Sequence, residues 1–236
     1  MSTLFDLNGK VALLTGASKG MGLAMATALA QHGATVVISA RKQDQLDLAA
    51  EKINTACGGK RAIGLAANAG HKEDLENLVK AVDYISMHTY PYHNSHYNPE
   101  FWGVPENEED ISDTKKIEFA MIRAIEFSKK QYDSVTNYMK SLGVNKPIHI
   151  GETGWASVSD GHYGPKGSKA TDEYKQGLYY SLMREWTNEA GISCFYFEAF
   201  NEQWKDAHNA NGSENHFGLF TADGEAKYPI WDLVDK

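Results

Sequence analysis

The sequence predicts an α/β fold of about six parallel strands with intervening helices. Short apolar runs alternate with longer segments whose apolar residues recur at helical spacing. Glycines stand at many of the boundaries between them. The predicted strands are 10–16, 34–41, 61–68, 83–92, 147–155 and 192–200. The predicted helices are 20–32, 43–57, 71–82, 113–142 and 171–190.

The first three strand–helix units follow a regular rhythm. Residues 10–16 (KVALLTG) form an apolar run that ends in glycine, which is typical of a buried parallel strand. The helix at 43–57 carries an apolar stripe and is followed by two glycines that end it. The residues of this stripe, expected to face the core, are Leu46, Ala49, Ala50 and Ile53.

The segments between the predicted strands become longer after residue 82. The strand at 83–92 ends in aromatic residues and proline, and a long polar loop precedes the segment 113–142, which is predicted as one or two helices. No Pro-, Gly- or Ser-rich spacer separates the two parts. We therefore expect a single domain over 1–236, in which a fragment at 1–82 and a fragment at 83–236 share one sheet.

The composition is that of a soluble globular protein, with 42% hydrophobic and 23% charged residues. A net charge of −8 argues against a nucleic-acid partner, because phosphate binding needs a basic face. The sequence has no apolar run of membrane-spanning length, and its start, MSTLFDLNGK, lacks the order of a secretory signal. A cytoplasmic protein without a membrane partner is therefore expected.

Cysteines and histidines give no metal signature. Cys57 and Cys194 stand alone in the sequence and are expected to be reduced thiols. His88, His93 and His96 surround one predicted strand end, but their spacing fits no common zinc site. No metal is expected.

A glycine-rich turn between the first strand and the first helix predicts phosphate binding. TGASKGMG (residues 15–22) follows a strand and opens a helix, whose N-terminus offers free N–H groups and a positive dipole to an anion. Arg41 and Lys42 follow the second strand, where an acidic residue would hold a ribose hydroxyl, so the cofactor expected here is NADP rather than NAD. The candidate cofactor-binding residues are Gly16, Ser18, Lys19, Gly20, Met21, Gly22, Arg41 and Lys42.

On this turn, residues 5–80 resemble the N-terminal Rossmann half of short-chain dehydrogenases/reductases, whose loop pattern is TGxxxGxG. The resemblance implies a dinucleotide-binding fragment. It ends early, because no tyrosine in the sequence has a lysine four residues later, which is the family's catalytic pair. Without that pair no group hands a proton to a reacting carbonyl, so a reductase is not expected.

The second fragment places carboxylates, a lysine and aromatic rings at successive strand ends. GETGW puts Glu152 at the end of one predicted strand, where α/β barrels keep catalytic groups, and HTYPY puts two tyrosines at the end of the strand before it. Rings and carboxylates on one edge are typical of a sugar site. The candidate catalytic residues are Glu152, Glu202, Lys205 and Glu214, with Tyr90, Tyr92 and Trp155 as candidate substrate-binding residues. Glu198 is expected to be a structural partner.

By its motifs YPY, GETGW, FNE and HFGLF, the segment 83–236 resembles the C-terminal barrel strands of glycoside hydrolase family 17 β-1,3-glucanases. The resemblance implies that Glu152 is the nucleophile of a retaining mechanism. Glu202, Lys205 and Glu214 would form its supporting network. The family's acid/base glutamate lies in a GNE-type segment, which this sequence does not contain.

Together the two resemblances predict a hybrid of a Rossmann half and a TIM-barrel fragment. An open doubly wound sheet is preferred over a small or incomplete barrel, because the Rossmann half contains the point at which the strand order of such an open sheet reverses. The open sheet would lack a helix layer on one face, whereas six strands would make a tight barrel. Association of two chains into a homo-oligomer would relieve either problem.

Three functions follow from this hybrid. The leading hypothesis is an artificial chimera without turnover that retains NADP binding. The alternative is a weak β-1,3-glucan hydrolase or glucan binder that uses Glu152, so any activity would be that of a glycoside hydrolase rather than an oxidoreductase. A third is a natural fusion whose acid/base comes from a missing partner chain.

Overall fold

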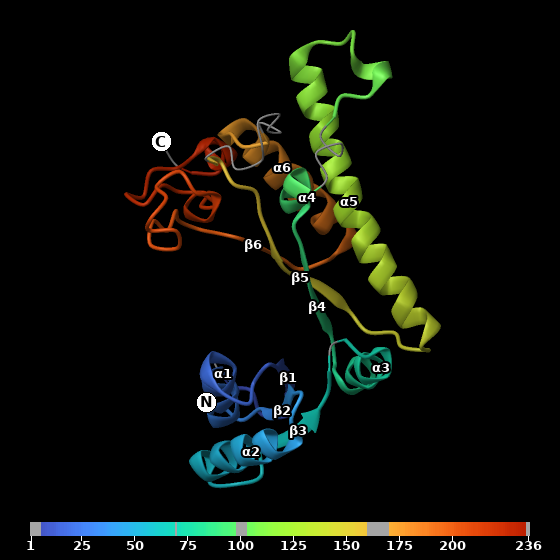
Figure 1. The fold of residues 1–236 in the computed structure, drawn as a ribbon, viewed down its shortest axis with the longest axis vertical. Helices are drawn as coiled ribbons and strands as arrows, with labels where there is room; N and C mark the ends of the chain where they lie inside the picture. Colours follow the sequence, from blue (N-terminus) through green and yellow to red (C-terminus); the bar gives the residue numbers. More distant parts are fainter. Residues whose placement is uncertain (1–5, 69, 98–102, 160–169, 235–236) are drawn as a thin grey trace. The chain divides into compact units, whose positions relative to one another are not determined.

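The computed structural model describes residues 6–68, 70–97, 103–159 and 170–234 (Figure 1). The chain divides into two compact units. Unit 1 contains Met1–Ile85 and Met139–Pro147, and unit 2 contains Ser86–Tyr138 and Ile148–Lys236. Each unit has a parallel sheet and helices of its own, and we describe each by itself.

Unit 1 is built on a three-stranded parallel sheet in the order β1-β2-β3. Its strands are β1 (Val11–Thr15), β2 (Thr35–Ala40) and β3 (Ala62–Ala66). Its helices are α1 (Gly20–Gln31), α2 (Gln43–Cys57) and α3 (Lys72–Ala81). Helix α2 ends at Gly58, whose φ of 66° is the left-handed conformation that glycine adopts without strain.

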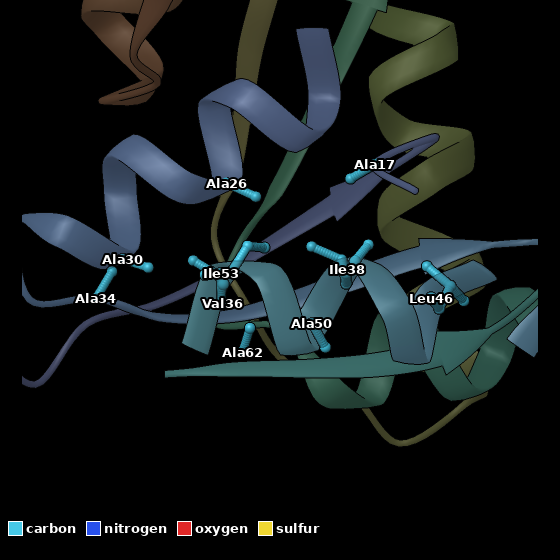
Figure 2. Packing of buried hydrophobic residues seen from close by; sticks show 11 residues of the cluster. Ala17, Ala26, Ala30, Ala34, Val36, Ile38, Leu46, Ala50, Ile53 and Ala62 are labelled. Carbon is cyan, nitrogen blue, oxygen red and sulfur yellow. The ribbon is translucent and has the colours of Figure 1, made fainter. Parts of the chain in front are cut away.

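The core of unit 1 lies between its sheet and the helices α1 and α2 (Figure 2). Val36 and Ile38 of β2 are fully buried, and the whole predicted stripe of α2 is buried with them. A Cβ atom on Gly64 would lie 2.9 Å from the Cβ of Leu46, so glycine at this position of β3 lets α2 pack closely on the sheet.

Unit 2 contains the second parallel sheet, in the order β4-β5-β6. Its strands are β4 (Ile85–Thr89), β5 (Ile148–Thr153) and β6 (Cys194–Tyr196). Its helices are α4 (Pro91–Tyr97), α5 (Asp113–Ser141) and α6 (Glu173–Ala190), with short 3-10 turns η2 (Glu106–Glu108), η3 (Ser213–Asn215) and η4 (Tyr228–Ile230). The segment predicted as one or two helices is therefore one, α5.

The core of unit 2 is aromatic. Tyr92, Trp155, Tyr179 and Phe217 each have less than 2% of their surface exposed. The ring centroid of Trp155 lies 5.1 Å from that of Tyr179 and 5.5 Å from that of Tyr92. The buried amide of Gln176 on α6 donates to the backbone carbonyls of Trp155, Phe217 and Gly218 at 2.8 to 3.2 Å, which fastens the loops after β5 and β6 to this helix.

The predicted α/β class with parallel strands is confirmed, but the expected continuous sheet of six strands is not found in the part of the chain that the structure describes. The strands form two separate sheets there, and neither closes into a barrel. In the second sheet, Ile85 at the start of β4 donates to the carbonyl of Pro147, which precedes β5, and Ile150 of β5 donates to that of Ser193, which precedes β6, both at 2.9 Å. A single domain over 1–236 stays a prediction.

Candidate active site

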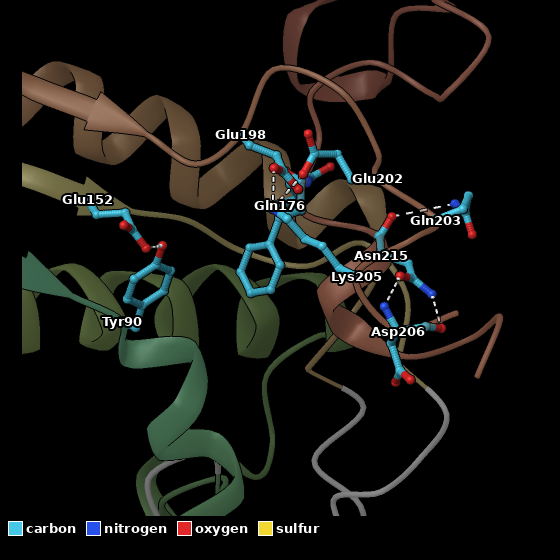
Figure 3. Close-up of polar contacts among 10 residues, drawn as sticks. Tyr90, Glu152, Gln176, Glu198, Glu202, Gln203, Lys205, Asp206 and Asn215 are labelled. Atoms are coloured by element: carbon cyan, nitrogen blue, oxygen red, sulfur yellow. Dashed lines mark hydrogen bonds and ion pairs between the residues drawn. The ribbon is translucent and has the colours of Figure 1, made fainter. Parts of the chain in front are cut away.

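Glu152 lies near the C-terminal end of β5 with 37% of its side chain exposed. The next residue, Thr153, points into the core, where its hydroxyl donates to the carbonyl of Thr89 at 2.7 Å. Since side chains alternate along a strand, Glu152 projects from the opposite face. The hydroxyl of Tyr90 donates to Glu152 Oε1 at 2.5 Å (Figure 3). Nδ1 of His88 lies 3.7 Å from Oε2.

The contact between Tyr90 and Glu152 has a clear electrostatic consequence. Burial, the hydrogen bond to Glu152, and the negative charges of Glu152 and Glu214 raise the pKa of Tyr90 well above its usual range. The phenol therefore keeps its proton and serves as a fixed donor to one carboxylate oxygen. Glycine at position 151 lets β5 pack closely on β4, because a Cβ atom there would collide with Oγ of Ser86.

A second charged cluster follows β6. The Nζ of Lys205 lies 2.5 Å from Glu198 Oε2 and 2.9 Å from Glu202 Oε2, and 3.9 Å from the centroid of the Phe197 ring (Figure 3). Burial raises the pKa of Glu198, and the ammonium of Lys205 offsets part of this rise. Burial also lowers the pKa of Lys205, but its hydrogen bonds to the two carboxylates outweigh that effect and raise the pKa. The lysine remains a cation that both acids share.

Glu214 lies on η3 with an exposed side chain. Its neighbour Asn215 is fully buried and holds this loop in place: its side chain accepts from the backbone N–H of Asp206 at 2.8 Å and donates to the carbonyls of Asp206 and Asn209 at 3.0 Å. The bonds to Asn215 thereby fix the segment that follows Lys205 against the turn that carries Glu214.

Two aromatic side chains connect the two clusters. The ring centroid of Phe217 lies 6.0 Å from that of Tyr90 and 5.6 Å from that of Phe197, whose ring lies under Lys205. The structure thus brings together Tyr90 with Glu152, and Lys205 with Glu202 and Glu198, in two clusters of unit 2 that are linked through the buried ring of Phe217. Glu198 is held by Lys205, as expected of a structural partner.

The structure places two of the candidate substrate-binding residues in the core. Tyr92 and Trp155 are 0% exposed, and the indole N–H of Trp155 donates to the carbonyl of Ala170 at 2.8 Å. Direct stacking on a sugar needs an exposed ring face, which neither residue offers here, so both support the site from behind. The sequence reasoning missed Trp204, which is 71% exposed beside Lys205. The signal was present, since Trp204 lies inside the FNEQWK motif.

The glycine-rich turn of unit 1 borders a cavity of about 780 Å³. Gly16, Ser18, Lys19, Arg41 and Lys42 are among the residues that line it. The turn has the form that phosphate binding requires: Gly16 and Gly20 have φ of 68° and 59°, and a Cβ atom on Gly22 would lie 2.8 Å from Cα of Ala17. Met21 is 83% exposed in the first turn of α1. These residues fit a dinucleotide phosphate.

Comparisons with known proteins identify the family. Residues 34–218 match the BtgE/BtgC glycoside hydrolase domain. The chain belongs to this glycoside hydrolase family. The crystal structure of an endo-laminarinase from Formosa Hel1_33_131 is 50% identical, with a TM-score of 0.72, over 91% of this chain and 62% of that one.

Each of two curated relatives matches only part of the chain. A glucan 1,3-beta-glucosidase of Arthroderma benhamiae is 34% identical over 128 residues, which are 48% of this chain and 40% of the relative. An uncharacterised oxidoreductase of Mycobacterium tuberculosis is 46% identical over 75 residues, which are 32% of this chain and 28% of the relative. The chain therefore spans less than half the length of these two relatives.

These findings favour a glycoside hydrolase over an oxidoreductase, and they support the alternative hypothesis better than the leading one. Similarity to dehydrogenases is found for part of the chain, but nothing supports an artificial origin. In the described ranges no helix is long and apolar enough to cross a membrane. Among the same residues no group of three His, Cys, Asp or Glu side chains is arranged to hold a metal ion; the side chain of His96 lies outside them.

Proposed function

We propose that unit 2 binds β-1,3-glucan and that Glu152 forms a covalent glycosyl ester with it. One observation carries the proposal: a solvent-accessible carboxylate at a strand end is held by a phenol that keeps its proton. The endo-laminarinase and the glucan 1,3-beta-glucosidase among the relatives support β-1,3-glucan as the substrate class.

The hydrogen bond from Tyr90 determines which oxygen of Glu152 attacks. Oε1 accepts a hydrogen bond from the phenol at 2.5 Å, whereas Nδ1 of His88 lies 3.7 Å from Oε2, beyond hydrogen-bond distance, so we assign Oε2 as the oxygen that approaches the anomeric carbon. As the bond between Oε2 and C1 forms, the bond from C1 to the leaving oxygen breaks, and the leaving group departs with the electron pair. Lys205 with its two carboxylates is linked to Tyr90 through the rings of Phe197 and Phe217 and adds a charged cluster to the site.

Protonation of the leaving group limits turnover of natural glucan. A retaining glycosidase places its acid about 5 Å from the nucleophile, and losing general-acid catalysis typically costs about 10² to 10⁴ in rate. The sequence has no GNE-type segment to supply this acid, and Glu198 and Glu202 are both engaged by Lys205. We therefore expect slow hydrolysis of laminarin. With a substrate whose leaving group departs without a proton, the first step should be fast, but the second step should be slow because the missing acid would also act there as the base that activates water.

The test uses 2,4-dinitrophenyl β-laminaribioside, because dinitrophenolate is a stable anion. We expect a burst of one dinitrophenolate per chain, followed by slow turnover. Azide should accelerate the second step by attacking the ester at C1, giving β-laminaribiosyl azide with retained configuration. Glu152→Gln should abolish the burst, whereas Glu185→Gln, an exposed acid on α6, should not change it. Absence of release by the unmodified chain, or equal release by Glu152→Gln, would refute the proposal.

We also propose that unit 1 binds NADP at its glycine-rich turn, on the evidence of the cavity lined by Lys19, Arg41 and Lys42. The bound cofactor would supply a hydride acceptor, while the residues of this chain would hold its phosphates. The N–H groups of the first turn of α1 would donate to the pyrophosphate oxygens, and the two cations after β2 would hold the 2′-phosphate. The test is the thermal unfolding midpoint with and without NADP⁺. A midpoint that NADP⁺ does not raise would refute this proposal.

A further inference from the structure

Trp204 is the most exposed of the large apolar side chains that the structure describes in unit 2. Its side chain is 71% exposed, whereas the indole of Trp155 in the same unit is fully buried. Tryptophan has a large apolar surface, so covering this ring with a ligand would remove much apolar area from water. It lies between Glu202 and Lys205, both of which belong to the charged cluster of the candidate site.

The position of Trp204 is continuous with the site that surrounds Glu152. The Nζ of Lys205 lies 5.9 Å from the Trp204 ring centroid and 3.9 Å from the Phe197 ring. From Phe197 the contacts continue through Phe217 to Tyr90, which donates to Glu152. An unbroken set of contacts thus runs from the nucleophile candidate to the exposed indole.

The segment that presents Trp204 is held in place on both sides. Lys205 donates its backbone N–H to the carbonyl of Glu202 at 3.1 Å, which closes a turn around the tryptophan. Asp206 donates its N–H to the buried side chain of Asn215 at 2.8 Å. A ring that is presented by an ordered turn loses little conformational freedom when a ligand covers it.

We propose that Trp204 is a binding platform for a glucosyl unit of the β-1,3-glucan chain, outside the bond that Glu152 attacks. The axial C–H groups of a pyranose make an apolar face that fits the π-surface of an indole, and the indole N–H is a donor for a sugar hydroxyl. Lys205 lies near the ring and would donate to hydroxyls at its edge. This inference rests on the proposed function, because it extends the same site.

The test is calorimetric titration with laminarihexaose in the Glu152→Gln background, so that the sugar is not consumed. Trp204→Ala should weaken binding about tenfold, which corresponds to about 1.4 kcal/mol. Trp204→Phe should retain most of the affinity because it keeps an aromatic face. The matched control is Trp231→Ala, because Trp231 is also exposed, at 54%, but lies in the C-terminal segment after η4. Trp231→Ala should bind laminarihexaose as tightly as the Glu152→Gln parent.

If Trp204→Ala binds laminarihexaose as tightly as the Glu152→Gln parent, or if Trp231→Ala loses as much affinity as Trp204→Ala, the assignment of Trp204 as a binding platform is wrong, while the proposal that unit 2 binds glucan still holds. If the Glu152→Gln parent does not bind laminarihexaose and the unmodified chain releases no dinitrophenolate from the activated substrate, the proposed function fails and the inference fails with it. Equal thermal midpoints of the variants show that a loss of affinity is not a loss of fold.

Discussion

Lys205→Met is the substitution whose effect can be worked out most fully from the structure. It removes the cation from two carboxylates, of which Glu198 is 13% exposed and Glu202 is 36% exposed. Removing one partner of a fully buried ion pair costs about 3–5 kcal/mol. Because Glu202 can rehydrate, we expect a smaller loss of about 2–3 kcal/mol in the free energy of unfolding of unit 2 at pH 7.

The pH dependence of this loss identifies its cause. Burial already raises the pKa of Glu198, and without Lys205 nothing offsets that rise. An acid whose pKa is higher in the folded state than in the unfolded state binds more protons when the protein is folded. Its carboxylate therefore does not destabilise the fold at pH values below the pKa of the unfolded state, and it destabilises the fold increasingly as pH rises through the pKa of the folded state. Lys205→Met should therefore lose little stability near pH 4 and the full amount at pH 7.

The assay is urea unfolding at both pH values, followed by tryptophan fluorescence. The five tryptophans all lie within the residue ranges of unit 2, so the signal reports this unit. The matched control is Lys129→Met, which breaks the exposed pair with Glu126 on α5 and should change stability by less than about 0.5 kcal/mol. A loss in Lys205→Met no larger than this control, or an equal loss at both pH values, would refute the reasoning.

Three further predictions concern buried polar groups and the first unit. Burial lowers the pKa of Lys227 from 10.5 to about 8, so the unfolded chain binds more protons between these values. Relative to Lys227→Met, the unmodified chain should gain up to about 3 kcal/mol of stability as pH rises from 8 to 10.5, measured by urea unfolding. Gly22→Ala should destabilise unit 1, because the added Cβ would lie 2.8 Å from Cα of Ala17, and the amide hydrogens of α1 should exchange faster. The control Gly59→Ala, which has open space around the added Cβ, should have little effect on this exchange. Arg41→Asp should abolish the rise in thermal midpoint with NADP⁺, and it should keep or increase the rise with NAD⁺. In the unmodified chain, NADP⁺ at 100 times its dissociation constant should add about 2.7 kcal/mol to the free energy of unfolding.

The sequence predicts the elements and the main acid of the site well, because both depend on local patterns. The stripe of α2 is buried as its helical spacing requires, from 0% at Leu46 and Ile53 to 7% at Ala50. Glu152 lies near the end of β5 with an exposed side chain, as its place in GETGW indicates.

The sequence does not predict features that depend on distant contacts. Strand pairing is decided by hydrogen bonds between remote residues, so the separation into two sheets has no local signal. The burial of an aromatic ring is also a tertiary property. Trp155 and Trp204 each follow a candidate catalytic glutamate by two or three residues, yet Trp155 donates to a core carbonyl and Trp204 lies in solvent. The burial of a charged side chain is a tertiary property as well. Lys227 is buried and donates to Ser157, and no local sequence pattern predicts this.

The most direct test of the central claim is to locate the covalent ester. The chain is incubated with 2,4-dinitrophenyl 2-deoxy-2-fluoro-β-laminaribioside, in which fluorine slows the second step so that the ester accumulates, and is then digested and analysed by mass spectrometry. We predict one added 2-fluoro-laminaribiosyl group per chain, on the peptide that contains Glu152. A label on another residue, or no label while dinitrophenolate is released, would contradict the assignment of Glu152 as the nucleophile.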